Sequence, residues 1–156
     1  MAILEILKYP HTNLKKKVEK INIINNNIIN ITNSMIETMI HNNGIGLAAP
    51  QVNINKQIIV ISINEKIKPL ILINPIIILK KGITTNTEGC LSFPDVFVKV
   101  KRNKIIKVIF FDLNGKKNLF LADNLLSICI QHEIDHLNGI TLYDKMSTLK
   151  KKLIQK

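Results

Sequence analysis

The sequence of 156 residues is poor in aromatic residues and in arginine. It has five phenylalanines, two tyrosines and no tryptophan, and Arg102 is the single arginine among its 22 basic residues. Proteins that recognise a nucleic-acid sequence usually rely on arginine for bidentate contacts and on aromatic rings for stacking. The formal net charge of +11 therefore indicates solubility rather than sequence-specific binding of nucleic acid.

Cysteine and long apolar runs are also scarce. Cys90 and Cys129 are too few for the disulfide framework of a small secreted protein, and residues 1–10 lack the pattern of a signal or transit peptide. The longest apolar stretch, residues 69–79, is interrupted by an Asn-Pro pair and is shorter than the roughly 20 residues that cross a bilayer. We therefore expect a cytoplasmic protein with free thiols and no membrane segment.

Periodicity predicts a single α+β domain over residues 1–156, with an N-terminal helix, short mixed or antiparallel sheets and a central C-terminal helix. Apolar residues spaced by three and four indicate a helix over residues 24–41, which Asn42-Asn43-Gly44 ends. Short runs rich in Ile and Val predict strands over residues 57–63, 70–74, 76–79 and 104–111.

The last third of the chain contains a predicted turn and two predicted helices. The Asn114-Gly115 pair is typical of a tight hairpin turn. A helix is expected over residues 124–137, with Asp123 as its cap and Asn138-Gly139 as its stop. Residues 144–156 form a basic tail that we expect to be a short helix.

The pattern that points to chemistry is His132-Glu133-Ile134-Asp135-His136. Two histidines four residues apart lie on one face of a helix and can bind one metal ion, and the Glu between them can act as general base on a water molecule at that ion. Two surface histidines on a polar helix are the plain alternative. The pattern favours a metal-dependent hydrolase.

A third ligand is expected upstream of this motif. One known pattern places a third histidine six residues after the second, but Leu142 stands there, and Asp144 is the only acidic residue beyond the motif. The upstream candidates are His11, His41, Cys90 and Cys129. Cys90 stands out because Gly89 precedes it and Pro94 follows closely, whereas Cys129 is expected to be a small apolar residue in a wall beside the site.

Three segments together resemble the signature motifs of peptide deformylases, in the same order and at the same intervals: Gly44-Ile45-Gly46-Leu47-Ala48-Ala49-Pro50-Gln51-Val52, Glu88-Gly89-Cys90-Leu91-Ser92 and Gln131-His132-Glu133-Ile134-Asp135-His136. The resemblance extends over residues 4–149. It implies hydrolytic removal of the N-formyl group from the initiator methionine of new bacterial polypeptides, with release of formate.

The resemblance also implies a role for individual residues. Cys90, His132 and His136 would bind one divalent metal, typically Fe²⁺ and often replaced by Ni²⁺ or Zn²⁺, and Glu133 would be the general base. The side-chain amide of Gln51 and the backbone N–H of Leu91 would stabilise the oxyanion, although Gln51 taken alone could equally be a hydrogen-bonding residue at a strand edge. Gly46 would present its backbone to the substrate peptide.

The helix that carries the motif also offers a wall for the methionine side chain. Leu125, Ile128 and Cys129 precede His132 on the same face and, with Ile45, could line an apolar pocket, or could all be ordinary core. Two positions depart from the family pattern: Asn43 stands where an acidic residue or proline is more usual, and Asn86 where an apolar pocket residue is common.

The expected partners follow from this activity. They are polypeptides that begin with formyl-methionine. The protein itself is expected to be a monomer. Some family members dock on the ribosome through a longer basic helix than residues 144–156 can form, so transient ribosome association is a weaker expectation. A general zinc endopeptidase, or a basic ribosome-binding protein without activity, are the alternatives.

Overall fold

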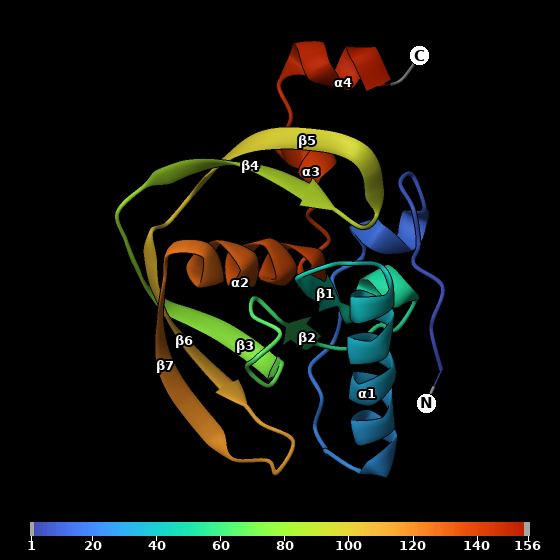
Figure 1. Ribbon diagram of the computed structural model, residues 1–156, viewed down its shortest axis with the longest axis vertical. Helices are drawn as coiled ribbons and strands as arrows, with labels where there is room; N and C mark the ends of the chain where they lie inside the picture. The colour runs from blue at the N-terminus through green and yellow to red at the C-terminus, as the bar shows by residue number, and fades with distance from the viewer. Residues whose placement is uncertain (1, 155–156) are drawn as a thin grey trace.

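The computed structural model describes residues 2–154 and places a long helix, α1 (Asn26–His41), near the N-terminal segment (Figure 1). The helix begins two residues later than predicted because the side chain of Asn25 accepts a hydrogen bond from the N–H of Ile28 at 3.1 Å and caps it. It ends as expected, and Asn43, with φ of 57°, adopts the left-handed conformation just beyond its last turn.

The larger of the two sheets has five strands, and every pairing between these strands is antiparallel. Its strands are, in spatial order, β1 (Gly46–Ala48), β2 (Ile58–Ile61), β3 (Leu70–Lys81), β6 (Ile105–Phe111) and β7 (Lys117–Asp123). The predicted Asn114-Gly115 turn joins β6 to β7. The short 3₁₀ helices η1 (Thr12–Lys15) and η2 (Ala49–Val52) lie outside the sheet.

The prediction of two separate strands over residues 70–74 and 76–79 is wrong. The structure has one strand, β3, that passes through Pro75. Asn74 adopts φ of 52°, and the pairing of β3 with β6 shifts register between Ile73 and Ile76. This bulge accommodates a proline that cannot donate to the ladder, so the strand continues past it.

More than one sheet was expected, but the two strands of the second sheet were not among the predicted strands. This sheet pairs β4 (Thr84–Cys90) with β5 (Phe93–Arg102) and lies on the opposite side of the central helix from the larger sheet (Figure 1). Its inner face contains Phe93, Val98 and Val100, which pack with Leu142 and Met146 in a small core of their own. This hairpin is the element that carries the second signature segment.

The central helix, α2 (Asn124–Leu137), has the predicted bounds and lies between the two sheets (Figure 1). Asp123 stands at its N-cap position but makes no capping hydrogen bond through its side chain, so the predicted cap is wrong in that detail. Nine of its residues are buried, including both motif histidines and Glu133, because sheets cover it on two sides. A helix held in this way can keep side chains at fixed positions.

After Gly139 the chain forms two short helices, α3 (Leu142–Lys145) and α4 (Thr148–Ile154), rather than the single predicted helix. Between them Met146 is extended and buried, which interrupts the helix. α4 has no buried residue and lies at the top of Figure 1, where Lys150 donates to the carbonyl oxygen of Phe97 and Ile154 packs against the small core. The last two residues of the predicted tail, Gln155 and Lys156, lie outside the described residues. Within residues 2–154, no helix is long and apolar enough to cross a membrane.

Gly139→Ala is expected to destabilise the protein more than Gly115→Ala, although both glycines have similar positive φ values of 74° and 77°. A Cβ at position 139 would lie 2.3 Å from the carbonyl oxygen of Lys15, whereas one at position 115 meets nothing within 4 Å. Both variants carry a backbone cost of about 1–2 kcal/mol. Thermal unfolding should therefore show a further loss for Gly139→Ala, and equal shifts would contradict the contact.

Candidate active site

Three possible metal ligands meet where the end of β4 faces α2. The sulfur of Cys90 and one ring nitrogen each from His132 and His136 all lie within 4.8 Å of one another, with Cys90 Sγ 3.4 Å from His136 Nε2. Among residues 2–154 this is the one such group of three or more His, Cys, Asp or Glu side chains. The other upstream candidates, His11, His41 and Cys129, do not join it.

The chemistry of these donors fits a divalent transition metal. One thiol and two imidazoles suit iron or zinc, and three protein ligands leave a coordination position for a water molecule or substrate. Burial lowers the pKa of His136 well below its usual value, whereas Glu133, Cys90 and Glu88 raise the pKa of His132 against the effect of burial. Metal binding requires the neutral imidazole of both histidines.

Glu133 lies beside the three donors and is buried. Its Oε1 makes no hydrogen bond within the described chain, which is rare for a buried carboxylate oxygen. Burial raises the pKa of Glu133 to about 7, and Glu88 adds to the rise, while His132 and Arg102 oppose it. A carboxylate with a pKa near neutral that lines a pocket is suited to accept and return a proton.

Gly46 makes room for this carboxylate. A Cβ built on Gly46 would lie 2.6 Å from Oε2 of Glu133 and 3.2 Å from its Cδ. Gly46 was predicted to contact the substrate through its backbone. It has a second role, because a side chain at this position would prevent β1 from approaching Glu133 so closely.

Gly46→Ala is expected to lower kcat about 100-fold while metal content stays unchanged, because the added methyl group displaces the Glu133 carboxylate by about an ångström. Steady-state kinetics and metal analysis on the same preparation test this. Gly44→Ala is the comparison, since its Cβ would meet the rotatable end of the Leu91 side chain. A loss as large in Gly44→Ala would contradict the specific contact with Glu133.

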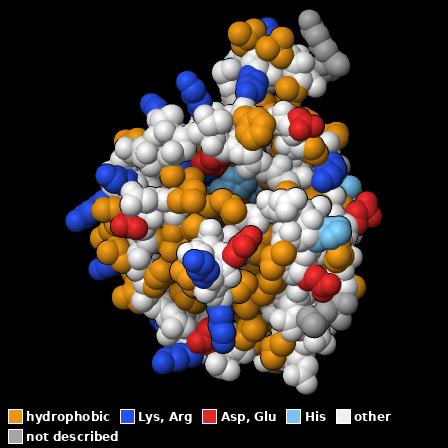
Figure 2. Space-filling model, in the orientation of Figure 1, with side chains coloured by type: hydrophobic (Ala, Val, Ile, Leu, Met, Phe, Trp, Pro, Cys, Tyr) orange, Lys and Arg blue, Asp and Glu red, His pale blue; other side chains and the backbone are white. Residues whose placement is uncertain are grey.

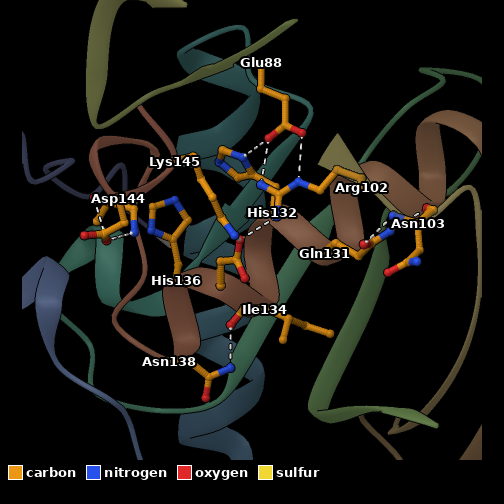
Figure 3. Close-up of polar contacts among 12 residues, drawn as sticks. Glu88, Arg102, Asn103, Gln131, His132, Ile134, His136, Asn138, Asp144 and Lys145 are labelled. Atoms are coloured by element: carbon orange, nitrogen blue, oxygen red, sulfur yellow. Dashed lines mark hydrogen bonds and ion pairs between the residues drawn. The ribbon is translucent and has the colours of Figure 1, made fainter. Parts of the chain in front are cut away.

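Sequence reasoning missed the group that orients His132. Glu88 accepts a hydrogen bond from His132 Nδ1 at 2.8 Å and two from Arg102 at 2.9 Å each, as Figure 3 shows. Arg102 also pairs with Asp135, one residue before His136. The contact at Nδ1 leaves Nε2 of His132 to face the metal position. Arg102 is the single arginine of a lysine-rich chain, and this singularity was the one feature of the sequence that could have pointed to its role beside Glu88.

Charge pairing dominates the electrostatics of Glu88. Burial would raise its pKa, but the hydrogen bonds from Arg102 and His132 outweigh it and lower the pKa to about 2. Arg102 is held charged in the same way, since its contacts with Glu88 and Asp135 raise its pKa against burial. The pair therefore stays ionised at neutral pH and keeps its hydrogen bond to His132.

Gln51 directs its side-chain N–H groups toward the end of β4. The N–H of Ala48 donates to Gln51 Oε1 at 2.9 Å, which fixes the orientation of the amide. Gln51 Nε2 then donates to Ser92 Oγ at 3.2 Å and lies 3.5 Å from Cys90 Sγ. Leu91 lies between Cys90 and Ser92 and lines the same pocket. The two predicted oxyanion donors thus belong to one side of the site.

A pocket of about 580 Å³ opens beside these residues, and Figure 2 shows a histidine side chain at the bottom of a hollow rimmed by hydrophobic groups. All four residues of the predicted side-chain pocket line it: Ile45, Leu125, Ile128 and Cys129. Burial, together with the charge of Glu133, raises the pKa of Cys129 to about 12, so this residue stays a neutral thiol in the wall.

Comparison with known proteins identifies the family. The profile of the polypeptide deformylase family matches residues 3–152. The chain is 50% identical to the peptide deformylase of Buchnera aphidicola subsp. Schizaphis graminum over 100% of this chain and 94% of that protein, and 45% identical to that of Nitrosococcus oceani over the same shares.

Solved structures agree with the sequence comparison. A peptide deformylase from Legionella pneumophila superposes with a TM-score of 0.95 at 34% identity and covers 99% of this chain and 92% of its own. One from Synechococcus elongatus, in complex with actinonin, superposes with a TM-score of 0.92 at 39% identity and covers 97% of this chain and 86% of its own. The chain therefore belongs to the peptide deformylase family and has the activity of that family, a metal-dependent amide hydrolysis.

Proposed function

We propose that this enzyme removes the formyl group from the N-terminal formyl-methionine of newly synthesised polypeptides, with Cys90, His132 and His136 as metal ligands and Glu133 as general base. The observation that carries the assignment is the buried Glu133 carboxylate, whose Oε1 has no partner among residues 2–154 and which lies beside the three ligands. A bound metal supplies Lewis acidity that makes a water molecule more acidic.

Glu133 moves one proton through the reaction. Its carboxylate takes a proton from the attacking water, and the water oxygen forms a bond to the formyl carbon. When the carbon–nitrogen bond breaks, Glu133 returns that proton to the leaving nitrogen. The products are formate and a free α-amino group, so Glu133 is regenerated without a further reactant.

Gln51 and Leu91 would stabilise the negative charge that develops on the formyl oxygen. Gln51 is buried and anchored through Ala48, so its Nε2 is held in place before substrate binds. A donor fixed in this way contributes about 3 kcal/mol to an oxyanion transition state. The backbone N–H of Leu91 is the second donor that we assign.

We assign Fe²⁺ as the native metal, with Zn²⁺ or Ni²⁺ able to replace it, as the family resemblance implies. A thiolate ligand suits both iron and zinc, so this assignment rests on the family. We further propose that the methionine side chain enters the pocket lined by Ile45, Leu125, Ile128 and Cys129. The protein would act as a cytoplasmic monomer in a bacterium.

Formate release from formyl-Met-Ala-Ser, after anaerobic loading with Fe²⁺, tests the proposed function. Acetyl-Met-Ala-Ser is the matched control substrate, because it differs by one methyl group and should release no acetate at a comparable rate. A fully metallated protein that leaves the formyl peptide intact would overturn the proposal. Cleavage of internal peptide bonds instead would favour an endopeptidase.

Transient association with the ribosome is a further part of the proposal. α4 carries Lys150, Lys151 and Lys152 on a helix with no buried residue, and Lys152 is exposed, which suits contact with anionic RNA. Co-sedimentation with ribosomes is expected to fall as salt rises and to fall again when residues 148–156 are deleted. Binding that responds to neither change would contradict this role for the tail.

A further inference from the structure

The four residues predicted to hold the methionine side chain are apolar or weakly polar, but the pocket that they line also includes an amide from β4. The wall formed by α2 is apolar or weakly polar, with Leu125, Ile128 and Cys129, and Ile45 extends it from the neighbouring segment. The wall formed by β4 includes Asn86, whose side chain carries an amide. Asn86 is half-buried.

Of the β4 residues that line the pocket, Asn86 is the farthest along the strand from Cys90. It precedes Cys90 by four strand residues, a separation of about 13 Å. On the facing helix, Leu125 precedes His132 by seven residues, a separation of about 10 Å. Because both residues line the same pocket, the terminal atoms of a bound methionine side chain, rather than its backbone, would meet Asn86.

The amide of Asn86 has hydrogen-bonding capacity to spare. Its Nδ2 donates to Thr84 Oγ1 at 3.3 Å, and this is its one hydrogen bond to residues 2–154. A primary amide carries two N–H donors, so one remains for a ligand. The contact with Thr84, which precedes it by two on the same face of β4, holds the amide in place.

An N–H donor forms only a weak hydrogen bond with the sulfur of methionine, which is a weak acceptor. It forms a stronger one with the oxygen of methionine sulfoxide. The oxygen of a sulfoxide is polar, and its burial in an apolar pocket without a hydrogen bond is costly. We propose that Asn86 is a specificity-determining residue that donates a hydrogen bond to the sulfoxide oxygen, so that this enzyme also deformylates peptides that begin with formyl-methionine sulfoxide. This inference rests on the proposed function of the pocket.

The experiment compares kcat/KM for formyl-Met-Ala-Ser and for the same peptide with methionine sulfoxide. The quantity of interest is the sulfoxide-to-thioether ratio within one metallated preparation, which removes differences in metal content and folded fraction. Asn86→Leu, close in shape but without the amide, is expected to lower this ratio about tenfold. Thr85→Val, a polar-to-apolar change on the opposite face of β4, is the matched control and should keep the wild-type ratio.

A fall in the ratio of threefold or more in Asn86→Leu, with the Thr85→Val ratio unchanged, supports the proposal, and any smaller fall overturns it. If Asn86→Leu does not fold, Asn86→Ala serves for the same comparison. Failure of the proposed function is distinguishable, because the wild type would then not release formate from the thioether peptide either.

Discussion

Glu133→Gln is expected to lower kcat for formyl-Met-Ala-Ser about a thousandfold while the protein keeps its metal. Glutamine has the size and polarity of glutamate but cannot take a proton from water, so the chemical step loses its base. The metal should remain because Glu133 is not one of the three grouped ligand donors. Stopped assays of formate release and metal analysis on the same sample measure both quantities.

Glu37→Gln is the matched control for this variant. Glu37 is an exposed carboxylate on α1, so its replacement changes the net charge equally but leaves the pocket untouched. Wild-type kcat is expected for it. If Glu133→Gln retained a tenth or more of the wild-type kcat, Glu133 would not be the base.

Cys90→Ser is expected to lose metal, and with it nearly all activity. A serine hydroxyl is a neutral and harder ligand than a thiolate, and it is about half an ångström shorter in reach, so affinity for iron or zinc should fall at least tenfold. Metal content after dialysis against a weak chelator measures the change. Far-ultraviolet circular dichroism would show whether the fold is kept.

The second cysteine supplies the control. Cys129→Ser makes the same substitution within the same pocket, on a thiol that is absent from the grouped ligand donors. Its metal content is therefore expected to equal that of the wild type. Equal metal loss in both variants would mean that the site responds to disturbance of the pocket in general, and retention in both would exclude Cys90 as a ligand.

The parts of the fold that could be predicted are those where packing alone sets the residue pattern. The apolar spacing of α1 could be recognised because one face of that helix meets a core, and the bounds of α2 followed from the residues at its two ends, Asp123 and Asn138-Gly139. The Asn114-Gly115 turn was predicted from backbone conformation, and Gly115 does adopt a positive φ of 77°. These signals are local, so the sequence alone contains them.

The hairpin of β4 and β5 was missed for a functional reason. The inner face of β4 carries Asn86, Glu88 and Cys90, which line the pocket and face the helix, in place of the apolar residues that usually mark a buried strand. Polar residues occupy both faces of β4, so the strand lacks the alternation of apolar and polar residues by which strands are predicted. The polar residues of β4 that form the site are therefore also the reason why this strand was not predicted.

The site itself was predicted in part from spacing and in part from family resemblance. The two histidines follow from helical geometry, whereas Cys90 could be placed beside them with confidence only by the motif. The contact of Glu88 with His132 and Arg102 joins positions 14 and 44 residues apart, and no local pattern carries such a contact. The single arginine of a lysine-rich chain was the clue, since it forms a bidentate pair that lysine cannot form.

The placement of the ligands on two separate elements has a consequence for how the chain unfolds. Cys90 and His136 are 46 positions apart, and the segment between them contains β5, β6 and β7. An ion held by both ends ties these elements together in the folded chain, and because unfolding separates the three donors, the free energy of metal binding adds to the free energy of unfolding. The supply of the metal would then govern the lifetime of the protein as well as its catalytic rate, because chains that lack the ion would unfold and be degraded first.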